Sequence, residues 1–300
     1  MILTEFAPAK VNLFLHVGPA QADGRHPICS LVTFAGLGDD LTAEPAGRYS
    51  LVVEGVFADQ AGPDADNLVT RALELAGAPP MAVRLTKRLP AAAGLGGGSS
   101  DAGAALRLAG RMFPGVTPDR LDRAAEALGA DGPMCLRATP CIAEGEGERL
   151  TVAPALPDSP AVLVNPGLPS PTGAVYQAYD ELGGAGSAER PLMPSSFSTV
   201  RDLAAFLALQ RNDLEAPAIR LEPGIGAALA EVRAMRDVLL ARMSGSGATV
   251  FGLFATDAAA KTAADDLRRA RPGWWIQPCR LNLQSAVKGA RRAESGAWAT

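Results

Sequence analysis

Several features that mark common classes of protein are scarce in this chain of 300 residues. Its four cysteines are scattered without Cys-x-x-Cys spacing, which disfavours both a zinc site and a disulfide framework. With only two histidines as well, a transition-metal enzyme is not expected. No apolar run approaches the roughly 18 residues of a membrane span, and the start, MILTEFAPAK, lacks the regions of a secretory signal. We therefore expect free thiols in a cytoplasmic protein without a membrane partner.

Positive charge is also too dispersed to form a nucleic-acid surface. The chain carries 28 Lys and Arg against 32 Asp and Glu, a formal net charge of −4. No segment is basic enough to neutralise a row of phosphates. We expect no nucleic-acid partner, and the sequence leaves the oligomeric state open.

The length and composition instead favour an α+β enzyme with two lobes. At 48% hydrophobic and 20% charged residues, the chain has the composition of a globular protein with a sizeable core. We expect an N-terminal domain at 1–151, a C-terminal domain at 152–285 and a disordered tail at 286–300.

Periodicity and turn residues predict the elements of both domains. Predicted strands cover 4–17, 49–55, 81–87, 161–167, 248–254 and 275–281, with a hairpin at 138–154. Predicted helices cover 67–77, 99–113, 118–129, 201–210, 223–241 and 256–270. Residues 166–198, rich in Pro, Gly and Ser, are expected to be mostly loop.

The most informative segment is LPAAAGLGGGSSDAGAAL, at 89–106, which joins a predicted strand to a predicted helix. Backbone N–H groups at a helix start lack partners, and glycines let them surround an anion, so the loop predicts a phosphate site. No Lys follows the glycines as in a P-loop, and the third glycine of the dinucleotide motif is missing. The alternative is a flexible glycine hinge.

Three other short segments each give only a weak indication of a ligand site when considered alone. Lys10 and Asn12 share one face of the first strand, where they can meet one ligand. Asp131 lies in a turn after a predicted helix, and Ser244-Gly245-Ser246-Gly247 precedes a predicted strand. Each also has an interpretation without a functional role: a surface lysine, a turn-forming aspartate and a tight turn, respectively.

Taken together and in order, APAKVNLFL, the glycine segment and MSGSGATVF resemble the three motifs of the galactokinase, homoserine kinase, mevalonate kinase and phosphomevalonate kinase superfamily. Within it, the chain is most similar to the branch that acts on a cytidine diphosphate-linked methylerythritol in non-mevalonate isoprenoid (terpenoid) biosynthesis. Further segments carry this second likeness: ADGRHPICSLVTF, DADNLVTRA, LGADGPMCL, AEGEGERL and NPGLPSPTGAVY.

The resemblance implies a transferase that moves the γ-phosphoryl group of ATP, with Mg²⁺, to the 2-hydroxyl of this small-molecule substrate in a cleft between two lobes. Asp131 matches the family's catalytic acid and Lys10 its partner lysine. The residues expected to surround the triphosphate are Pro90, Ala91, Ala92, Ala93, Gly94, Leu95, Gly96, Gly97, Gly98, Ser99 and Ser100. Asn67 and Lys87 resemble family positions that line the adenosine end of the bound ATP.

The remaining implied residues bind the acceptor. Asn12 would hydrogen-bond the substrate, Ser246 and Gly247 would help to close the cleft, and His26 would recognise the cytosine edge. Members of the branch usually carry Asp-Gly-Tyr-His where this chain has Asp23-Gly24-Arg25-His26. We expect Arg25 and Tyr176 to sandwich the base, since a guanidinium plane also stacks on aromatic rings.

Two alternatives remain open from the sequence. One is a kinase of the same superfamily with another small alcohol as acceptor, such as a mevalonate-type enzyme. The other is a nucleotide-binding protein without turnover. Asp23-Gly24-Arg25-His26 and Tyr176 argue against the first, and retention of both Lys10 and Asp131 argues against the second.

Overall fold

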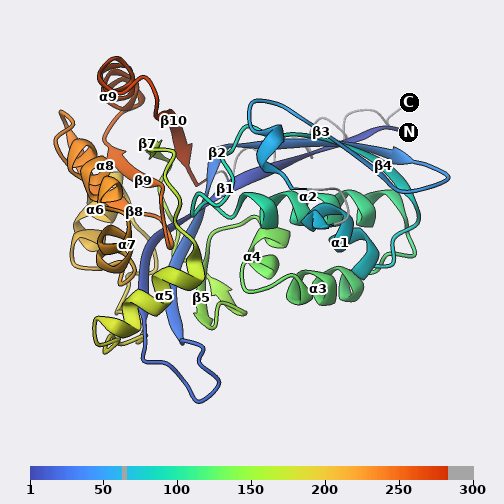
Figure 1. Ribbon diagram of the computed structural model, residues 1–300, viewed down its shortest axis with the longest axis horizontal. Coiled ribbons are helices and arrows are strands. Elements are labelled where there is room, and N and C mark those ends of the chain that lie inside the picture. Colours follow the sequence, from blue (N-terminus) through green and yellow to red (C-terminus); the bar gives the residue numbers. More distant parts are fainter. Residues whose placement is uncertain (63–65, 283–300) are drawn as a thin grey trace.

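The computed structural model describes residues 1–62 and 66–282. Two groups of elements each form a sheet with helices against it, which confirms the α+β class (Figure 1). The predicted division at 151/152 stays a prediction, and the predicted tail at 286–300 lies outside the described residues. No described helix is long and apolar enough to cross a membrane. All four cysteines are free thiols.

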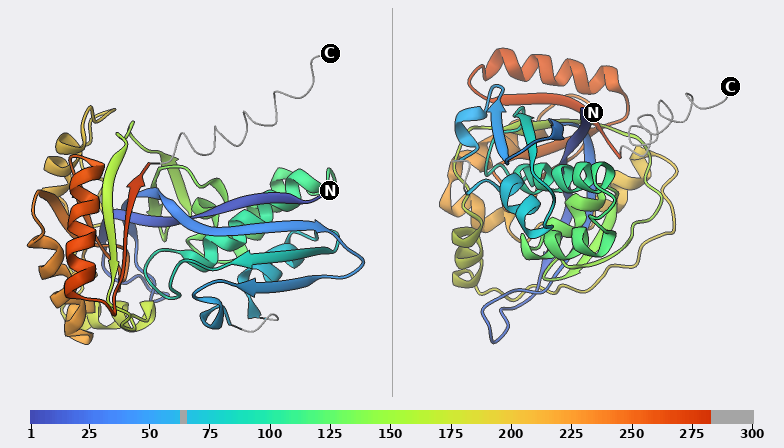
Figure 2. Two further views of the ribbon diagram at one scale, coloured as in Figure 1. Left: turned by 90° about the horizontal axis from the view of Figure 1, so that it is seen from above. Right: turned by 90° about the vertical axis from the view of Figure 1, so that its right-hand side faces the viewer.

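The first sheet is built on two long antiparallel strands, β1 (Leu3–Val17) and β2 (Ile28–Pro45). The second of these was not predicted. Figure 2 shows both strands running from one group of elements into the other. The sheet is completed by β3 (Ser50–Glu54), β4 (Met81–Thr86), β5 (Cys141–Gly145) and β6 (Arg149–Val152). The antiparallel pair β5 and β6 confirms the predicted hairpin.

Helices from the N-terminal half cover one face of this sheet (Figure 1). They are α1 (Leu68–Leu75), α2 (Gly97–Met112), α3 (Pro118–Ala127) and α4 (Gly132–Arg137), and the short 3₁₀ turn η1 (Ala58–Gln60) precedes them. The alanine-rich α2 packs on β1, and its small side chains, such as Ala102 and Ala105, are fully buried. Small side chains let the helix lie close to the strand that carries Lys10.

The second sheet has the order β10-β7-β9-β8, with every pair antiparallel. Its strands are β7 (Ser159–Asn165), β8 (Val238–Met243), β9 (Val250–Phe254) and β10 (Trp275–Leu281). The helices are α5 (Thr172–Glu181), α6 (Val200–Ala208), α7 (Glu215–Leu221), α8 (Pro223–Arg233) and α9 (Asp257–Ala270). The two sheets meet where Leu281 pairs with Ala35.

Both faces of the second sheet are buried, which explains the continuous apolar sequence of β7. Val162 and Val164 lie in a cluster with side chains of α8 and α9. Ala161 and Leu163 lie in the central cluster with side chains of α6 and β1. The central cluster therefore joins the second sheet to the strand that begins the chain.

One predicted helix is too long, and the segment predicted to be mostly loop contains one helix. The helix predicted over 223–241 ends at Arg233, and β8 follows because residues 238–243 pair with β9. A short apolar run does not distinguish a helix from a buried strand. Within the predicted loop 166–198, α5 forms because Val175, Ala178 and Tyr179 bury one helical face.

The regular alternation of two faces along β1 is interrupted after Asn12, so the shared face expected for Lys10 and Asn12 does not extend to Phe14. The pairing of β1 with β2 has an irregularity between Asn12 and Phe14. Phe14 then lies in the same apolar cluster as Val11 and Leu13. Every residue from Ala7 to Val17 is buried, so neither face of this part of the strand is left to solvent.

Gly103 sets how closely α2 and α4 approach. A Cβ at this position would lie 2.5 Å from the carbonyl oxygen of Cys135. We predict that Gly103→Ala lowers the free energy of unfolding by about 1–3 kcal/mol, because the helices must separate. Urea-induced unfolding measures this. Gly173→Ala is the matched control, since nothing lies within 4 Å of its Cβ position in α5; equal losses in both variants would contradict the packing argument.

Candidate active site

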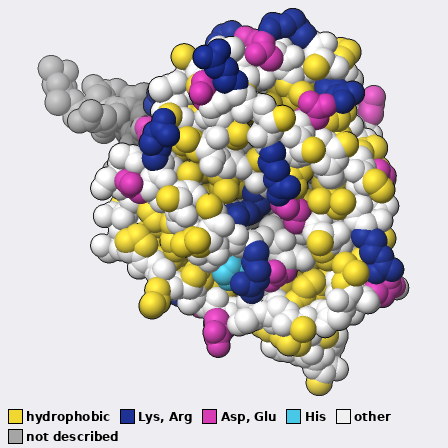
Figure 3. Space-filling view, turned by 90° about the vertical axis from the view of Figure 1, so that its left-hand side faces the viewer, with side chains coloured by type: hydrophobic (Ala, Val, Ile, Leu, Met, Phe, Trp, Pro, Cys, Tyr) yellow, Lys and Arg dark blue, Asp and Glu magenta, His cyan; other side chains and the backbone are white. Residues whose placement is uncertain are grey.

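One cavity brings most of the predicted site residues together. Its volume is about 690 Å³, within the usual range of small-molecule sites, and side chains from both groups of elements line it. Figure 3 shows basic, acidic and histidine side chains gathering near the middle of one face of the molecule. The predicted residues in the lining are Lys10, Asn12, Arg25, His26, Ala92, Ala93, Gly94, Gly96, Gly97, Gly98, Ser99, Asp131, Tyr176 and Ser246.

Lys10 and Asp131, 121 positions apart in sequence, form an ion pair in this cavity. Lys10 Nζ lies 3.0 Å from both carboxylate oxygens of Asp131. The lysine side chain is 7% exposed and the aspartate side chain is 36% exposed, so the carboxylate is open to a ligand while its partner is held in the protein. Gly132 allows the turn that presents Asp131, because a Cβ there would lie 1.9 Å from the carbonyl oxygen of Ala125.

The glycine loop ends beside this pair. Gly96 is the N-cap of α2 and has a left-handed backbone with φ of 60°. A Cβ on Gly96 would lie 3.2 Å from Lys10 Cε and 3.5 Å from Asp131 Oδ2. Gly97, Gly98 and Ser99 follow in the first turn of the helix and line the cavity. Free backbone donors and the positive end of a 16-residue helix therefore face the space next to the Lys10 ammonium.

Other residues of the loop point into the protein. Leu95 is 1% exposed, and its carbonyl accepts a hydrogen bond from Lys10 N. The Ser100 hydroxyl is fully buried and donates to the carbonyl of Pro8. Ala91 N donates to Gln60 Oε1 at 2.9 Å. None of Pro90, Ala91, Leu95 and Ser100 lines the cavity. Pro90, Leu95 and Ser100 are buried in the protein, whereas Ala91 is exposed.

Ser244, which sequence reasoning did not single out as a site residue, joins the glycine loop to β1. Its hydroxyl accepts from Asn12 N at 3.1 Å and donates to the carbonyl of Gly94 at 3.0 Å. Gly94 has φ of 72°, and its Cβ would collide with the backbone oxygens of Ser244 and Gly247. The two small-residue loops thus pack directly against each other. Gly247 lies in this contact and not in the cavity lining.

Only one of the two polar side-chain atoms of Asn12 has a hydrogen-bond partner among the described residues. Its Nδ2 donates to Ser30 Oγ at 2.7 Å. Its Oδ1 is buried and has no hydrogen-bond partner among the described residues. Buried acceptors are normally paired. A hydroxyl or amine donor in the cavity would satisfy this oxygen.

A second group of residues lines the cavity around His26. The His26 side chain is 4% exposed, with Nδ1 3.0 Å from the carbonyl of Gly18 and Nε2 3.4 Å from Asp180 Oδ2. The carbonyl accepts, so Nδ1 carries the proton. The Tyr176 ring lies 5.1 Å from the imidazole at an angle of 33°. Burial, with a smaller contribution from the charge of Asp131, raises the pKa of Tyr176 to about 12, so this ring remains a neutral phenol.

Arg25 reaches across this part of the cavity to Glu146, in the turn between β5 and β6. Its Nη1 lies 2.7 Å from Glu146 Oε2, and both residues line the cavity. The two side chains are 67% and 38% exposed. Glu146 lies in AEGEGERL, one of the segments that carry the family resemblance, but sequence reasoning did not single it out as a site residue.

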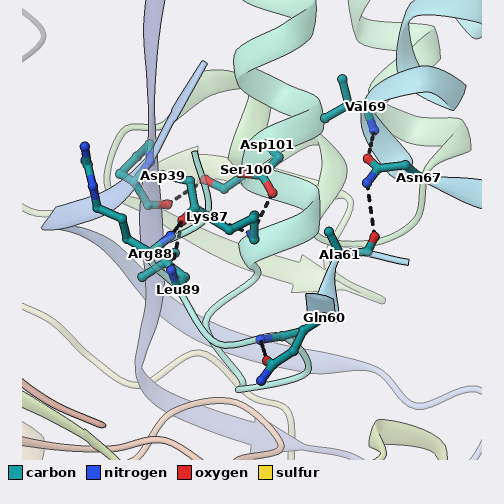
Figure 4. Close-up of polar contacts among 12 residues, drawn as sticks. Asp39, Gln60, Ala61, Asn67, Val69, Lys87, Arg88, Leu89, Ser100 and Asp101 are labelled. Atoms are coloured by element: carbon teal, nitrogen blue, oxygen red, sulfur yellow. Dashed lines mark hydrogen bonds and ion pairs between the residues drawn. The ribbon is translucent and has the colours of Figure 1, made fainter. Parts of the chain in front are cut away.

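Lys87 and Asn67 do not line the cavity. Figure 4 shows the polar contacts of both side chains. Lys87 Nζ is paired with Asp39 at 2.5 Å and with Asp101 at 2.7 Å. Asn67 caps α1, with Oδ1 accepting from Val69 N at 2.9 Å and Nδ2 donating to the carbonyl of Ala61 at 3.1 Å. Their predicted place at the adenosine end stays a prediction.

Among the described residues, no group of three or more His, Cys, Asp or Glu is placed to hold a metal ion. Mg²⁺ in phosphoryl-transfer sites keeps several waters and binds mainly to the nucleotide phosphates, with few protein ligands. Ser99 and Asp131, which line the cavity, are compatible with that mode.

Comparison with known proteins gives the family. The model of the GHMP kinases N-terminal domain matches residues 67–138, and that of the GHMP kinases C-terminal domain matches residues 192–272. A 4-diphosphocytidyl-2-C-methyl-D-erythritol kinase from Caulobacter vibrioides is 52% identical over 290 residues, covering 94% of this chain and 100% of its own. A protein of the same name from Paramagnetospirillum magneticum is 49% identical, and the match covers 92% of this chain and 97% of that protein.

Solved structures agree with this similarity. A 4-(cytidine 5′-diphospho)-2C-methyl-D-erythritol kinase has a TM-score of 0.73 and 35% identity, covering 93% of this chain and 99% of its own. A homoserine kinase from Cytophaga hutchinsonii has a TM-score of 0.63 at 17% identity, covering 94% of this chain and 96% of its own, which shows the shared fold alone. The chain belongs to the GHMP kinase family.

Proposed function

We propose that this protein is an ATP-dependent kinase that phosphorylates the 2-hydroxyl of 4-diphosphocytidyl-2-C-methyl-D-erythritol, in non-mevalonate isoprenoid precursor biosynthesis. The observation that carries the proposal is the Lys10–Asp131 ion pair at the N-terminus of α2, in the same cavity as His26 and Tyr176. One part of the cavity fits a polyphosphate and another fits an aromatic base. The close relatives described above bear the name of this activity.

ATP binds with its phosphates at the start of α2. The backbone N–H groups from Gly96 to Ser99 and the helix dipole attract the negative oxygens. Lys10 adds a full positive charge beside Gly96. Mg²⁺, held chiefly by the phosphates, would neutralise part of their negative charge. The role of the protein in such a transfer is mainly alignment and electrostatic stabilisation.

The acceptor hydroxyl lies against Asp131. Its oxygen forms a bond to the γ-phosphorus while the bond from that phosphorus to the β–γ bridging oxygen breaks, and ADP leaves. Asp131 Oδ accepts the hydroxyl proton, and Lys10 Nζ stabilises the negative charge of the transferring group. Asn12 Oδ1, which has no partner among the described residues, accepts from another substrate hydroxyl.

The cytidine end of the acceptor substrate lies near Tyr176 and Arg25. The neutral Tyr176 phenol ring stacks on one face of cytosine and the Arg25 guanidinium on the other. His26, which lines the same part of the cavity, lies at the polar edge of the base. Glu146 holds one edge of the guanidinium, which leaves the plane of Arg25 free for stacking.

A phosphoryl-transfer assay with γ-labelled ATP and a panel of acceptors tests the function. We predict transfer to the cytidyl methylerythritol only, with mevalonate, homoserine and galactose inactive, and competitive inhibition by cytidine nucleotides at the acceptor site. Transfer to mevalonate that cytidine nucleotides do not affect would show another acceptor class. ATP binding without transfer to any acceptor would show a non-catalytic nucleotide-binding protein.

Replacing Asp131 separates chemistry from nucleotide binding. Asp131→Asn keeps the size of the side chain but cannot accept the proton, so kcat is expected to fall about 10²-fold or more. The KM for ATP should change by less than about threefold, because the phosphates contact the helix start. Steady-state kinetics measure both. Asp122→Asn, an exposed carboxylate on α3, is the control for the change in charge; an Asp131→Asn enzyme as active as this control would remove the proposed base.

Adding a side chain to the glycine loop should act first on ATP. Gly96→Val places a branched side chain in a left-handed backbone and against Lys10 Cε. We predict that the KM for ATP rises at least about tenfold, because the backbone donors move off the phosphates. Gly115→Val is the control, since nothing lies within 4 Å of its Cβ position. An unchanged KM for ATP in Gly96→Val would be incompatible with the phosphate cradle.

A further inference from the structure

Three charged side chains from different elements meet beneath the glycine loop (Figure 4). Asp39 comes from β2, Lys87 follows β4, and Asp101 belongs to the second turn of α2. Lys87 Nζ lies 2.5 Å from Asp39 Oδ2 and 2.7 Å from Asp101 Oδ2. All three side chains are at most 4% exposed. The activity proposed above makes no use of this cluster.

The cluster holds both ends of the glycine loop. At the first end, Asp39 Oδ1 accepts from Arg88 N at 2.5 Å and from Leu89 N at 2.9 Å. At the second end, Asp101 connects the ammonium group to α2. A Cβ on Gly97 would lie 3.6 Å from Lys87 Nζ, so the ammonium lies directly under the first helical turn. The loop between 88 and 96 is therefore fixed at its two ends by one cation.

The charges cannot be separated at low cost. Burial alone would lower the pKa of Lys87, but Asp101 and Asp39 outweigh burial and raise it, so the lysine stays charged. Burial raises the pKa of Asp101 well above its usual value, and Lys87 opposes that shift. Removing the lysine would leave two neighbouring carboxylates in a dry environment without a cation, which is strongly unfavourable.

We propose that Lys87, clamped between Asp39 and Asp101, is a positioning residue for the nucleotide polyphosphate. It sets the distance between the end of β4 and the start of α2, and so aims the loop's backbone donors, without itself contacting ATP. The proposal rests on the nucleotide site proposed above. It gives Lys87 a role other than the adenosine contact that the family resemblance implies.

Binding of fragments of ATP separates these roles. With Lys87→Met, the Kd for ATP and the Kd for inorganic tripolyphosphate should rise by the same factor, on the order of tenfold, because a displaced loop loses phosphate donors. The Kd for adenosine should not change. Isothermal titration calorimetry on the full chain measures all three, and thermal denaturation records the stability of each variant.

Two further variants serve as controls, and a third is a second test of the clamp. Asp101→Asn keeps an amide oxygen that can accept from Lys87 Nζ, so tripolyphosphate binding should stay within about threefold of wild type. Asp101→Leu removes the acceptor, and should weaken tripolyphosphate binding as Lys87→Met does; it also replaces that variant if the latter does not fold. Arg107→Met removes a partly buried cation of α2 that binds Glu5 and the carbonyls of Phe6 and Cys135. It should lower the Tm and leave all three Kd values unchanged.

Several results would overturn the proposal. Weaker adenosine binding with unchanged tripolyphosphate binding would make Lys87 a nucleoside ligand. A lower Tm with all three Kd values unchanged would make it a structural residue only. Failure of wild type to bind tripolyphosphate would remove the site on which it rests. None of these readouts depends on which alcohol is phosphorylated, so an incorrect acceptor assignment is detected separately.

Discussion

The ion pair between Lys10 and Asp131 requires that β1, α2 and α4 approach one another more closely than ordinary side chains allow. Glycine stands at three close contacts around the pair. Gly96 faces Lys10, Gly103 faces the backbone of α4, and Gly132 faces the backbone of α3. A Cβ at Gly103 or Gly132 would collide with the backbone of the neighbouring helix, and a Cβ at Gly96 would crowd the side chain of Lys10. The glycines thus serve the geometry of the whole site as well as the approach of a phosphate.

The second group of elements completes this site through hydrogen bonds from side chains to the backbone. Ser244 bridges Asn12 N and the carbonyl of Gly94 with one hydroxyl, and Asn212 Nδ2 holds the carbonyls of Met243 and Gly245. The strand that carries the lysine, the loop proposed to bind phosphate and the turn before β9 are therefore one hydrogen-bonded unit. Movement of any one of them would be transmitted to the other two.

The sequence predicts the parts of this structure that depend on local pattern or on ordered motifs. The start of α2, the hairpin β5–β6 and the strand at 275–281 follow from turn residues and periodicity. The pairing of Lys10 with Asp131 follows only from the family resemblance, because neither residue stands out by itself. The helix predicted over 223–241 fails because residues 238–243 gain more from pairing with β9 than from continuing α8.

Long-range polar partners are the part that the sequence does not give. Asp39 lies in a strand that was not predicted, and its bonds to Lys87 and to the loop backbone span about 50 positions. Glu146 meets Arg25 only because a hairpin turn and the β1–β2 connection lie together. Both pairings depend on tertiary packing, which periodicity within one segment cannot reveal.

A crystal structure with a non-hydrolysable ATP analogue and the cytidyl methylerythritol substrate would show whether Lys10, Asp131 and the start of α2 act on one phosphate. We expect density for the terminal phosphate at the N–H groups of Gly96 to Ser99, with Lys10 Nζ and the acceptor 2-hydroxyl on either side. The hydroxyl oxygen should lie about 3 Å from an Asp131 carboxylate oxygen. A terminal phosphate bound away from the start of α2, or an acceptor hydroxyl beyond hydrogen-bonding reach of Asp131, would contradict it.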